Sequence, residues 1–328
     1  MASPWVKRKF LGNGSYGKVF LAQSAALLSY NNSPALVPFV ALKSCLASRS
    51  SSLQLERDVF RELGGCDGIV KCFGSGVSVE NGAEYFDLVL EYAPGGSLEQ
   101  FLRFRGGRIS ELEASCYTRM LVKGFCHVHR KGFVHCDMKP GNILVFPSKN
   151  AGGLVKYSLK LADFGSAKKG GEISCAFVDP CSGHKNRGTL LYSSPESVAF
   201  GEHEAAMDIW SLGCIVFEML TGNGLWSNYR GLSARVLGDL IAGYQDGGLV
   251  LSDDLSANAK DFLRKCLTRN IEERWTADQL LKHPFITESC KMLPLSASGQ
   301  TPRIMGRYQR IPFGSSFVAS NNPSVFVI

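Results

Sequence analysis

The sequence lacks the features that mark secreted, zinc-binding or membrane-spanning proteins. Its eleven cysteines are odd in number, with no Cys-x-x-Cys pair and no Cys/His cluster at zinc spacing, so neither a disulfide framework nor a zinc site is expected. No apolar run approaches the roughly 18–20 residues of a membrane-spanning helix, and the residues after Met1 form no apolar signal core. We therefore expect reduced thiols, no membrane insertion, and a cytoplasmic or nuclear location.

A large excess of one charge is missing as well. Lysine and arginine number 36 against 29 aspartates and glutamates, giving a net charge of +7, and +3 of it falls in the last 42 residues. An excess of this size does not predict a nucleic-acid partner. Residues 287–328 are also rich in Ser, Asn, Gly and Pro without a sustained period, so we predict a flexible C-terminal tail.

The first hundred residues read mainly as strands. Apolar and β-branched residues predict one amphipathic helix at residues 52–63 and short strands at 6–11, 18–23, 38–46, near 69–74 and at 85–91. The glycine-rich turns between these runs favour hairpins.

After Pro94-Gly95-Gly96 the pattern becomes mainly helical. Helices are predicted at 117–128 and at 276–282, before Pro284. Residues 209–220 are apolar nearly all round, which is typical of a helix buried in a large domain, and Gly222 is placed to end it. The fold class is therefore α+β.

Glycines with the spacing Gly-x-Gly-x-x-Gly lie between the first two expected strands. They let backbone N–H groups approach phosphate oxygens without a Cβ in the way. A Rossmann site has this spacing too, but it needs a helix directly after the loop and a parallel βαβ unit. Here a β-type run follows, which favours a β-hairpin that covers a bound nucleotide. The sequence Gly-Lys-Ser/Thr, which would mark a P-loop, does not follow the glycines. The candidate nucleotide-binding residues are Leu11, Gly12, Asn13, Gly14, Ser15, Tyr16, Gly17, Lys18 and Val19.

A lysine on the third expected strand and a glutamate in the following helix form a second candidate pair. Lys43 ends the segment Ala41-Leu42-Lys43, and Glu56 lies thirteen residues later. A lone lysine on a strand is usually solvated, and the alternative for Glu56 alone is an exposed helix face. A helix carboxylate can hold such a lysine against phosphates by a charge-assisted hydrogen bond.

The most informative segment runs from His135 to Asn142. Asp137 can orient a hydroxyl nucleophile and accept its proton, Lys139 can neutralise a transferring phosphoryl group, and the Asn142 side-chain oxygen can ligate Mg²⁺. Asp163, in Leu161-Ala162-Asp163-Phe164-Gly165, adds a second hard oxygen ligand. Each segment alone reads as a polar turn; together they predict phosphoryl transfer.

Because these motifs follow one another in a fixed order, residues 5–286 resemble the catalytic domain of the eukaryotic protein kinases. The ordered set is Gly-x-Gly-x-x-Gly-x-Val, Ala-x-Lys, a helix Glu, His-x-Asp-x-Lys-x-x-Asn, Asp-Phe-Gly, Ser-Pro-Glu and Asp-x-Trp-Ser-Leu-Gly. The resemblance implies a two-lobed fold with a small β-rich N-lobe that carries one helix and a larger, mainly helical C-lobe. It also implies ATP and Mg²⁺ as cofactors.

The resemblance assigns roles to residues along the chain. Leu90 would be the gatekeeper, and residues 91–93 the hinge that binds adenine. The implied set adds to the glycine loop the cofactor-binding residues Ala41, Lys43, Glu91, Ala93 and Leu144, the catalytic residues Lys43, Glu56, Asp137, Lys139 and Asn142, and the Mg²⁺ ligands Asn142 and Asp163.

Three structural roles follow from the same resemblance. Phe60 and Phe164 would stack with His135 in an apolar regulatory column. Asp208 would brace the catalytic loop, the segment from His135 to Asn142, from the buried helix. In the C-lobe, Glu196 would pair with Arg274.

The substrate class also follows by resemblance. The position of Lys139, two residues after Asp137, resembles that of a lysine in the Ser/Thr kinases. A second segment is similar to theirs, Gly188-Thr189-Leu190-Leu191-Tyr192-Ser193-Ser194-Pro195-Glu196. More narrowly, the chain resembles the short plant kinases of the mitogen-activated protein kinase kinase kinase group. This implies a protein substrate, a downstream kinase kinase, and a monomer or a transient association.

Cys136 departs from the pattern, because many kinases carry an arginine at this position. That arginine contacts the phosphorylated activation loop, and the two opposite charges offset each other. We expect activity to depend little on loop phosphorylation, or to depend on it through Lys168 or Lys169. The rival hypothesis from another class is a pseudokinase that signals by contact. It is disfavoured because Lys43, Asp137 and Asp163 are all present.

Overall fold

The computed structural model describes residues 4–26, 38–149, 155–170, 190–229, 231–246 and 251–288. The chain divides into two units, Met1–Met292 and Leu293–Ile328. The predicted tail lies, from residue 289 on, outside the described residues, as does Thr189. The described helices include none that is long and apolar enough to span a bilayer.

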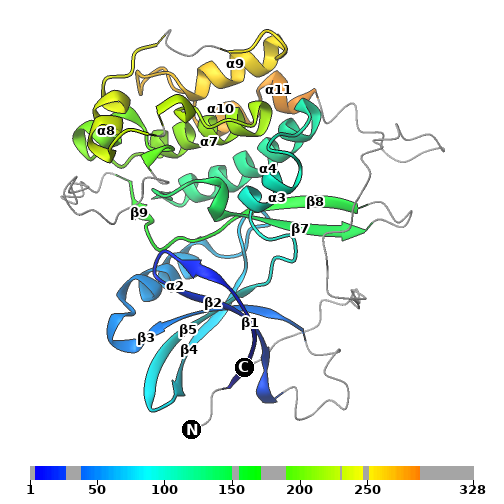
Figure 1. Cartoon of the computed structure of the whole chain (residues 1–328), viewed down its shortest axis with the longest axis vertical. Helices are drawn as coiled ribbons and strands as arrows, with labels where there is room; N and C mark the ends of the chain where they lie inside the picture. Colours follow the sequence, from blue (N-terminus) through cyan, green and yellow to red (C-terminus); the bar gives the residue numbers. More distant parts are fainter. Residues whose placement is uncertain are drawn as a thin grey trace. The chain divides into compact units, whose positions relative to one another are not determined.

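The first part of the chain forms an antiparallel sheet with one long helix beside it (Figure 1). The strands lie in the order β1-β2-β3-β5-β4. This confirms the predicted β-rich lobe. Its strands are β1 (Trp5–Gly14), β2 (Gly17–Ser24), β3 (Val40–Leu46), β4 (Cys72–Glu80) and β5 (Ala83–Glu91).

The fourth strand was wrongly placed by the sequence pattern. Instead of residues 69–74, β4 continues to Glu80 and pairs back through a tight turn at Asn81-Gly82. Both turn residues have positive φ, +51° and +79°, as a two-residue hairpin turn requires. The Asn-Gly dipeptide after the alternating Val77 and Val79 is the hairpin signal that the prediction overlooked.

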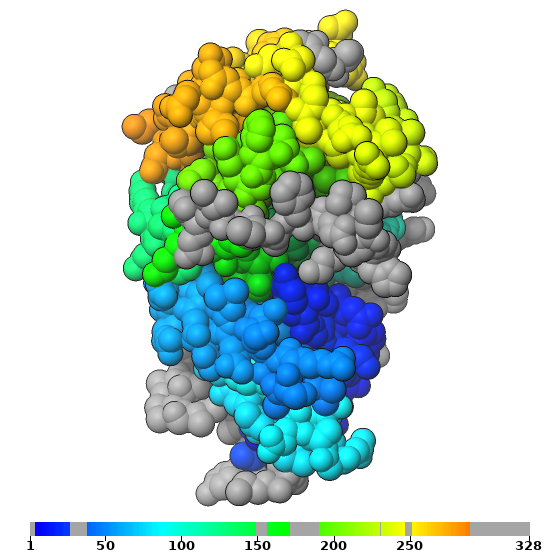
Figure 2. All heavy atoms as spheres, turned by 90° about the vertical axis from the view of Figure 1, so that its left-hand side faces the viewer, coloured from blue at the N-terminus to red at the C-terminus, as the bar shows by residue number. Residues whose placement is uncertain are grey.

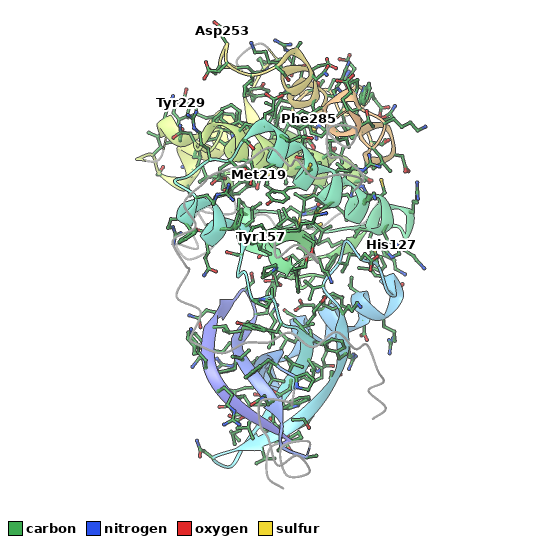
Figure 3. The ribbon with its side chains drawn as sticks, turned by 90° about the vertical axis from the view of Figure 1, so that its right-hand side faces the viewer. His127, Tyr157, Met219, Tyr229, Asp253 and Phe285 are labelled. Atoms are coloured by element: carbon green, nitrogen blue, oxygen red, sulfur yellow. The ribbon has the colours of Figure 1, made fainter. Side chains whose placement is uncertain are left out.

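Helix α2 (Ser51–Leu63) confirms the amphipathic helix predicted at 52–63. Its buried residues recur every three or four positions and include the charged Glu56. At its C-terminal end, Leu63 O lies 2.7 Å from Nε2 of His127 on α4 (Glu111–Arg130) (Figure 3). This contact fastens the helix of the smaller lobe to the larger lobe.

The larger lobe is mainly helical, as predicted; Figure 2 shows it in green to orange above the blue-to-cyan smaller lobe. Helix α4 extends well beyond the predicted 117–128. The helix predicted at 276–282 is shorter, because Pro284 starts a new helix capped by His283.

The sequence pattern did not predict the other short helices, which lack a long apolar stripe. Beside α4, the helices are α3 (Leu98–Phe104), α6 (Pro195–Phe200), α7 (Ala205–Thr221), α8 (Ala234–Ala242), α9 (Ala257–Cys266), α10 (Ala277–Leu280) and α11 (Pro284–Thr287).

Helix α7 is the buried helix predicted from residues 209–220. Trp210, Leu212 and Ile215 are fully buried, and Gly222 ends the helix in the left-handed conformation with φ +77°. Two small antiparallel pairs complete the lobe, β6 (Phe133–Val134) with β9 (Lys168–Lys169) and β7 (Ile143–Lys149) with β8 (Val155–Leu161).

The contact between α7 and α9 makes a specific prediction. A Cβ at Gly213 would lie 2.8 Å from Cys266 Cβ and 2.8 Å from Leu267 Cδ2, so Gly213→Ala should destabilise the protein by about 1–3 kcal/mol through overpacking. Gly238 on α8 is the matched control, since its Cβ would meet only Val198 Cγ1 at 3.7 Å. Gly238→Ala should stabilise by about 0.4–1 kcal/mol. Urea unfolding measures both, and equal effects would contradict the account.

Candidate active site

The amino group of Lys43 lies between two carboxylates that come from different elements. Nζ donates to Glu56 Oε2 on α2 at 2.7 Å and to Asp163 Oδ1, after β8, at 2.8 Å. Lys43 is 3% exposed and Glu56 is fully buried. The structure thus brings together two residues predicted as a pair and a third from a distant motif.

Burial and charge act against each other in this cluster. Burial raises the pKa of Glu56 to about 7, although Lys43 pulls it down. Burial also opposes the charges of Lys43 and Asp163, but the opposite charges outweigh it: the pKa of Lys43 is raised and the pKa of Asp163 is lowered. Lys43 therefore remains a cation, and Asp163 remains an anion that can bind a metal ion.

The three predicted residues of the catalytic loop also meet. Lys139 Nζ donates to Asp137 Oδ1 and Oδ2 at 3.0 and 2.8 Å. Asn142 Nδ2 donates to the Asp137 carbonyl at 2.7 Å and to its Oδ2 at 3.0 Å. Because Nδ2 of Asn142 bonds Asp137, the side-chain oxygen of Asn142 is the atom that suits Mg²⁺.

Asp208 holds this loop from α7, as the resemblance implies. Its carboxylate accepts hydrogen bonds from the backbone N–H groups of His135 at 2.8 Å and Cys136 at 3.1 Å, and His129 Nε2 lies 2.9 Å away. Cys136 and Asp163 both have positive φ, +65° and +64°. Such a backbone is strained for residues with a Cβ, and the fixed contacts around it keep it in place.

The Cys136 side chain carries no charge. Burial, and then the charge of Asp208, raises the pKa of its thiol, so the side chain stays neutral. Its Sγ donates to the Val134 carbonyl at 3.5 Å. Lys169 pairs with Glu62 on α2 at 3.1 Å. Of the two lysines named in the sequence prediction, Lys169 is thus already bound to α2, and the dependence on phosphorylation stays a prediction.

The expected apolar column connects α2 with the catalytic loop. The rings of Phe60 and Phe164 are 5.2 Å apart, and those of Phe164 and His135 are 4.7 Å apart. His135 Nε2 also lies 3.0 Å from the Ala162 carbonyl. Movement of α2 would therefore disturb the loop that carries Asp137.

The glycine hairpin closes over Lys43 and Asp163. Ser15 Oγ donates to Asp163 Oδ2 at 3.3 Å, and the hydroxyls of Tyr16 and Ser166 lie 2.8 Å apart. A Cβ at Gly14 would come within 3.1 Å of Lys43 Cε. The missing Cβ leaves room above Lys43, which fits a phosphate group there. The Tyr16–Ser166 contact spans 150 residues, and no sequence signal predicted it.

The other predicted nucleotide-binding residues differ in their burial. Ala41, Leu90 and Ala93 are buried, and Leu11, Val19 and Leu144 are half-buried against the core. On the hairpin, Asn13, Ser15 and Lys18 are exposed, while Gly12, Tyr16 and Gly17 are half-buried. Among the described residues, no group of three or more His, Cys, Asp or Glu side chains could hold a metal ion. Mg²⁺ at Asn142 and Asp163 would need further oxygen ligands, such as phosphates.

Lys160 on β8 is a site residue that sequence reasoning missed. It donates to Glu91 Oε1 and Oε2 at 2.8 and 2.7 Å, and the Lys71 backbone N–H donates to the same carboxylate at 3.1 Å. The Glu91 side chain is therefore held by two residues, and the Glu91 backbone N–H donates to the Lys71 carbonyl at 2.8 Å. A single lysine in a strand gave no signal, because its partner lies 69 residues away.

The whole arrangement can be compared with known proteins. Residues 5–286 match the family model described as the protein kinase domain. The chain belongs to the protein kinase family. Mitogen-activated protein kinase kinase kinase 20 of Arabidopsis thaliana is 37% identical over 286 residues, which cover 86% of this chain and 78% of the relative. Mitogen-activated protein kinase kinase kinase 17 of the same plant is 35% identical over 297 residues, covering 90% and 73%.

A relative from another organism has the same kind of name. Mitogen-activated protein kinase kinase kinase A of Dictyostelium discoideum is 31% identical over 293 residues, which cover 86% of this chain and 28% of that protein. The predicted resemblance to the protein kinases, and to this group within them, is confirmed, as is the two-lobed fold.

The Lys160–Glu91 pair predicts an effect on nucleotide binding in this kinase. Lys160→Met keeps the alkyl stem but removes two charge-assisted hydrogen bonds, so the KM for ATP should rise about tenfold. The value of kcat should change less than about twofold, because Lys160 touches neither the catalytic loop nor Lys43. Lys156→Met, on the same strand but exposed, is the matched control. Equal KM values for the two variants would show that the pair does not position the hinge.

Proposed function

We propose that this protein kinase transfers the γ-phosphoryl group of ATP, with Mg²⁺, to serine or threonine of a protein, and that its substrate is a downstream kinase kinase. The observation that carries the proposal is the position of Lys43, whose amino group bonds Glu56 and Asp163 at once. Lys139 beside Asp137 supports the Ser/Thr class. The relatives named mitogen-activated protein kinase kinase kinases support the level in a signalling cascade.

The residues of the cleft fit the cofactors. Lys43 would hold phosphate oxygens under the glycine hairpin, and Asn142 and Asp163 would supply hard oxygen ligands. When bound, ATP and Mg²⁺ supply the phosphoryl group and neutralise its charge. The apolar Val19, Ala41 and Leu144 would enclose the adenine.

Asp137 performs the proton step in the proposed reaction. Its carboxylate accepts bonds from Lys139 and Asn142, which fixes its orientation toward a substrate hydroxyl. It orients that hydroxyl and accepts its proton late, while Lys139 offsets the negative charge that develops nearby. Positioning and charge carry most of the catalysis, because phosphoryl transfer asks little covalent chemistry of the protein.

The same contacts weigh against a pseudokinase. Pseudokinases typically lose the strand lysine, the loop aspartate or the aspartate of Asp-Phe-Gly. Here Lys43 and Asp163 are hydrogen-bonded to each other, and Asp137 keeps both of its loop partners. A chain without selection for catalysis has no need of this connected set.

The test is Asp137→Asn in the full chain. The amide cannot accept the hydroxyl proton, so turnover on a purified kinase kinase should fall by about 10²–10⁴-fold. Nucleotide affinity should stay within about twofold, since Asp137 does not contact Lys43. Asp253→Asn, at a fully exposed carboxylate, is the control.

Substantial phosphorylation by purified Asp137→Asn protein would contradict its assignment. Phosphoamino-acid analysis of the wild-type product tests the substrate class. Phosphotyrosine without phosphoserine or phosphothreonine would contradict the proposed specificity.

A further inference from the structure

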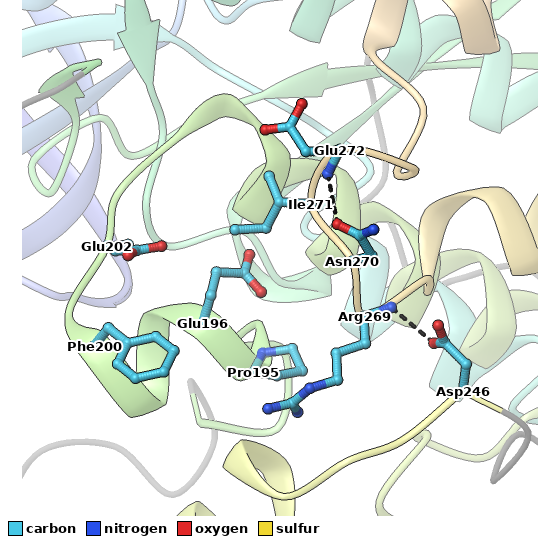
Figure 4. Close-up of a pocket in the computed structure, with 9 residues that line it drawn as sticks. All are labelled: Pro195, Glu196, Phe200, Glu202, Asp246, Arg269, Asn270, Ile271 and Glu272. Carbon is cyan, nitrogen blue, oxygen red and sulfur yellow. Dashed lines mark hydrogen bonds between the residues drawn. The ribbon is translucent and has the colours of Figure 1, made fainter.

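A groove of about 470 Å³ opens in the helical lobe, among residues that the phosphoryl-transfer site does not use. It lies between the end of α6 and the loop that follows α9 (Figure 4). The residues that line it are Pro195, Glu196, Phe200, Glu202, Asp246, Arg269, Asn270, Ile271 and Glu272.

The walls of this groove are fixed by hydrogen bonds. Arg274 donates to both oxygens of Glu196 at 2.6 and 3.1 Å, and both residues are buried. Arg269 donates from its guanidinium to the carbonyls of Ala242 at 2.7 Å and Tyr244 at 2.6 Å. A groove held this way is already formed before a partner arrives, which lowers the entropy cost of binding.

Its apolar part includes an unusually exposed aromatic ring. Phe200 is 70% exposed, the largest exposure among the large apolar side chains that the structure describes. It is the last residue of α6, and Gly201 in the left-handed conformation, φ +69°, fixes the direction in which the chain leaves it. Figure 4 shows Phe200 and Ile271 facing the same hollow. An apolar residue of a partner would bury both.

The rim of the groove carries negative charge. Glu202 and Glu272 are exposed, and neither carboxylate bonds another residue within the described ranges. The charge of Glu196 is offset by Arg274, and Asp246 accepts the Arg269 backbone N–H at 2.8 Å. The two free carboxylates stand out because the whole chain has a net charge of +7. They complement a cationic side chain.

We propose that this groove binds an extended segment of the protein substrate in which an arginine or lysine stands beside an apolar residue. The apolar residue packs on Phe200 and Ile271, while the cation meets Glu202 and Glu272. Pro195 and Glu196 of the Ser-Pro-Glu motif line the groove, so a docked segment would lie next to that motif. The identification of the partner as a substrate rests on the proposed function.

Binding can be measured without phosphoryl transfer. The probe is a short fluorescein-labelled peptide with two arginines followed by alternating leucine and alanine, and without serine, threonine or tyrosine. Fluorescence anisotropy with the full chain should show saturable binding that weakens as salt is added. Phe200→Ser and the double variant Glu202→Lys with Glu272→Lys should each weaken binding at least about tenfold.

Two controls separate the groove from general effects. Phe104→Ser removes another exposed phenylalanine, 50% exposed on α3, and Asp67→Lys with Glu84→Lys makes the same change in net charge at exposed sites. Both should bind the peptide like the wild type. A peptide with glutamates in place of the arginines should not bind.

The outcomes also separate this proposal from the proposed function. Binding that persists in Asp137→Asn and is lost in the groove variants supports the groove, whatever the turnover. No saturable binding, or equal binding by groove and control variants, overturns it even if phosphoryl transfer is normal. A dimer that the groove variants dissociate would assign the groove to a second copy of the chain and overturn it as well.

Discussion

The lysine amino group shared by two carboxylates is the constraint on which the rest of the cleft depends. Lys43 comes from the sheet, Glu56 from α2 and Asp163 from the loop after β8, and their atoms meet only when all three elements are in place. A buried cation left without partners would cost several kcal/mol. The position of α2 and the conformation of the Asp163 loop are therefore coupled through one nitrogen atom.

A second buried charge anchors the other side of the site. Asp208, 1% exposed on α7, satisfies its oxygens with the backbone N–H groups that precede Asp137. The column of Phe60, Phe164 and His135 joins this anchor to α2. The rigid helical lobe thus fixes the loop, and the loop, through the column, bears on the helix that carries Glu56.

The residues of the site could be predicted because each motif is short and has its own chemistry. The glycine spacing, Lys43 and the Asp137–Asn142 loop are legible without knowledge of distant contacts, and the structure places them together; their catalytic roles remain proposals. The long strands and helices were also predictable from their periods. The Lys160–Glu91 and Tyr16–Ser166 contacts were not, because local sequence says nothing about partners 69 and 150 residues away. Short helices such as α8 show too few turns for a clear period.

Replacement of Lys43 by methionine tests the central claim most directly. The variant keeps the length of the side chain but removes the cation that joins Glu56 to Asp163. Turnover of a protein substrate, measured beside a thermal melt of the same sample, should fall by about 10²–10³-fold while a cooperative melting transition remains. A folded Lys43→Met protein with turnover near that of the wild type would contradict the account.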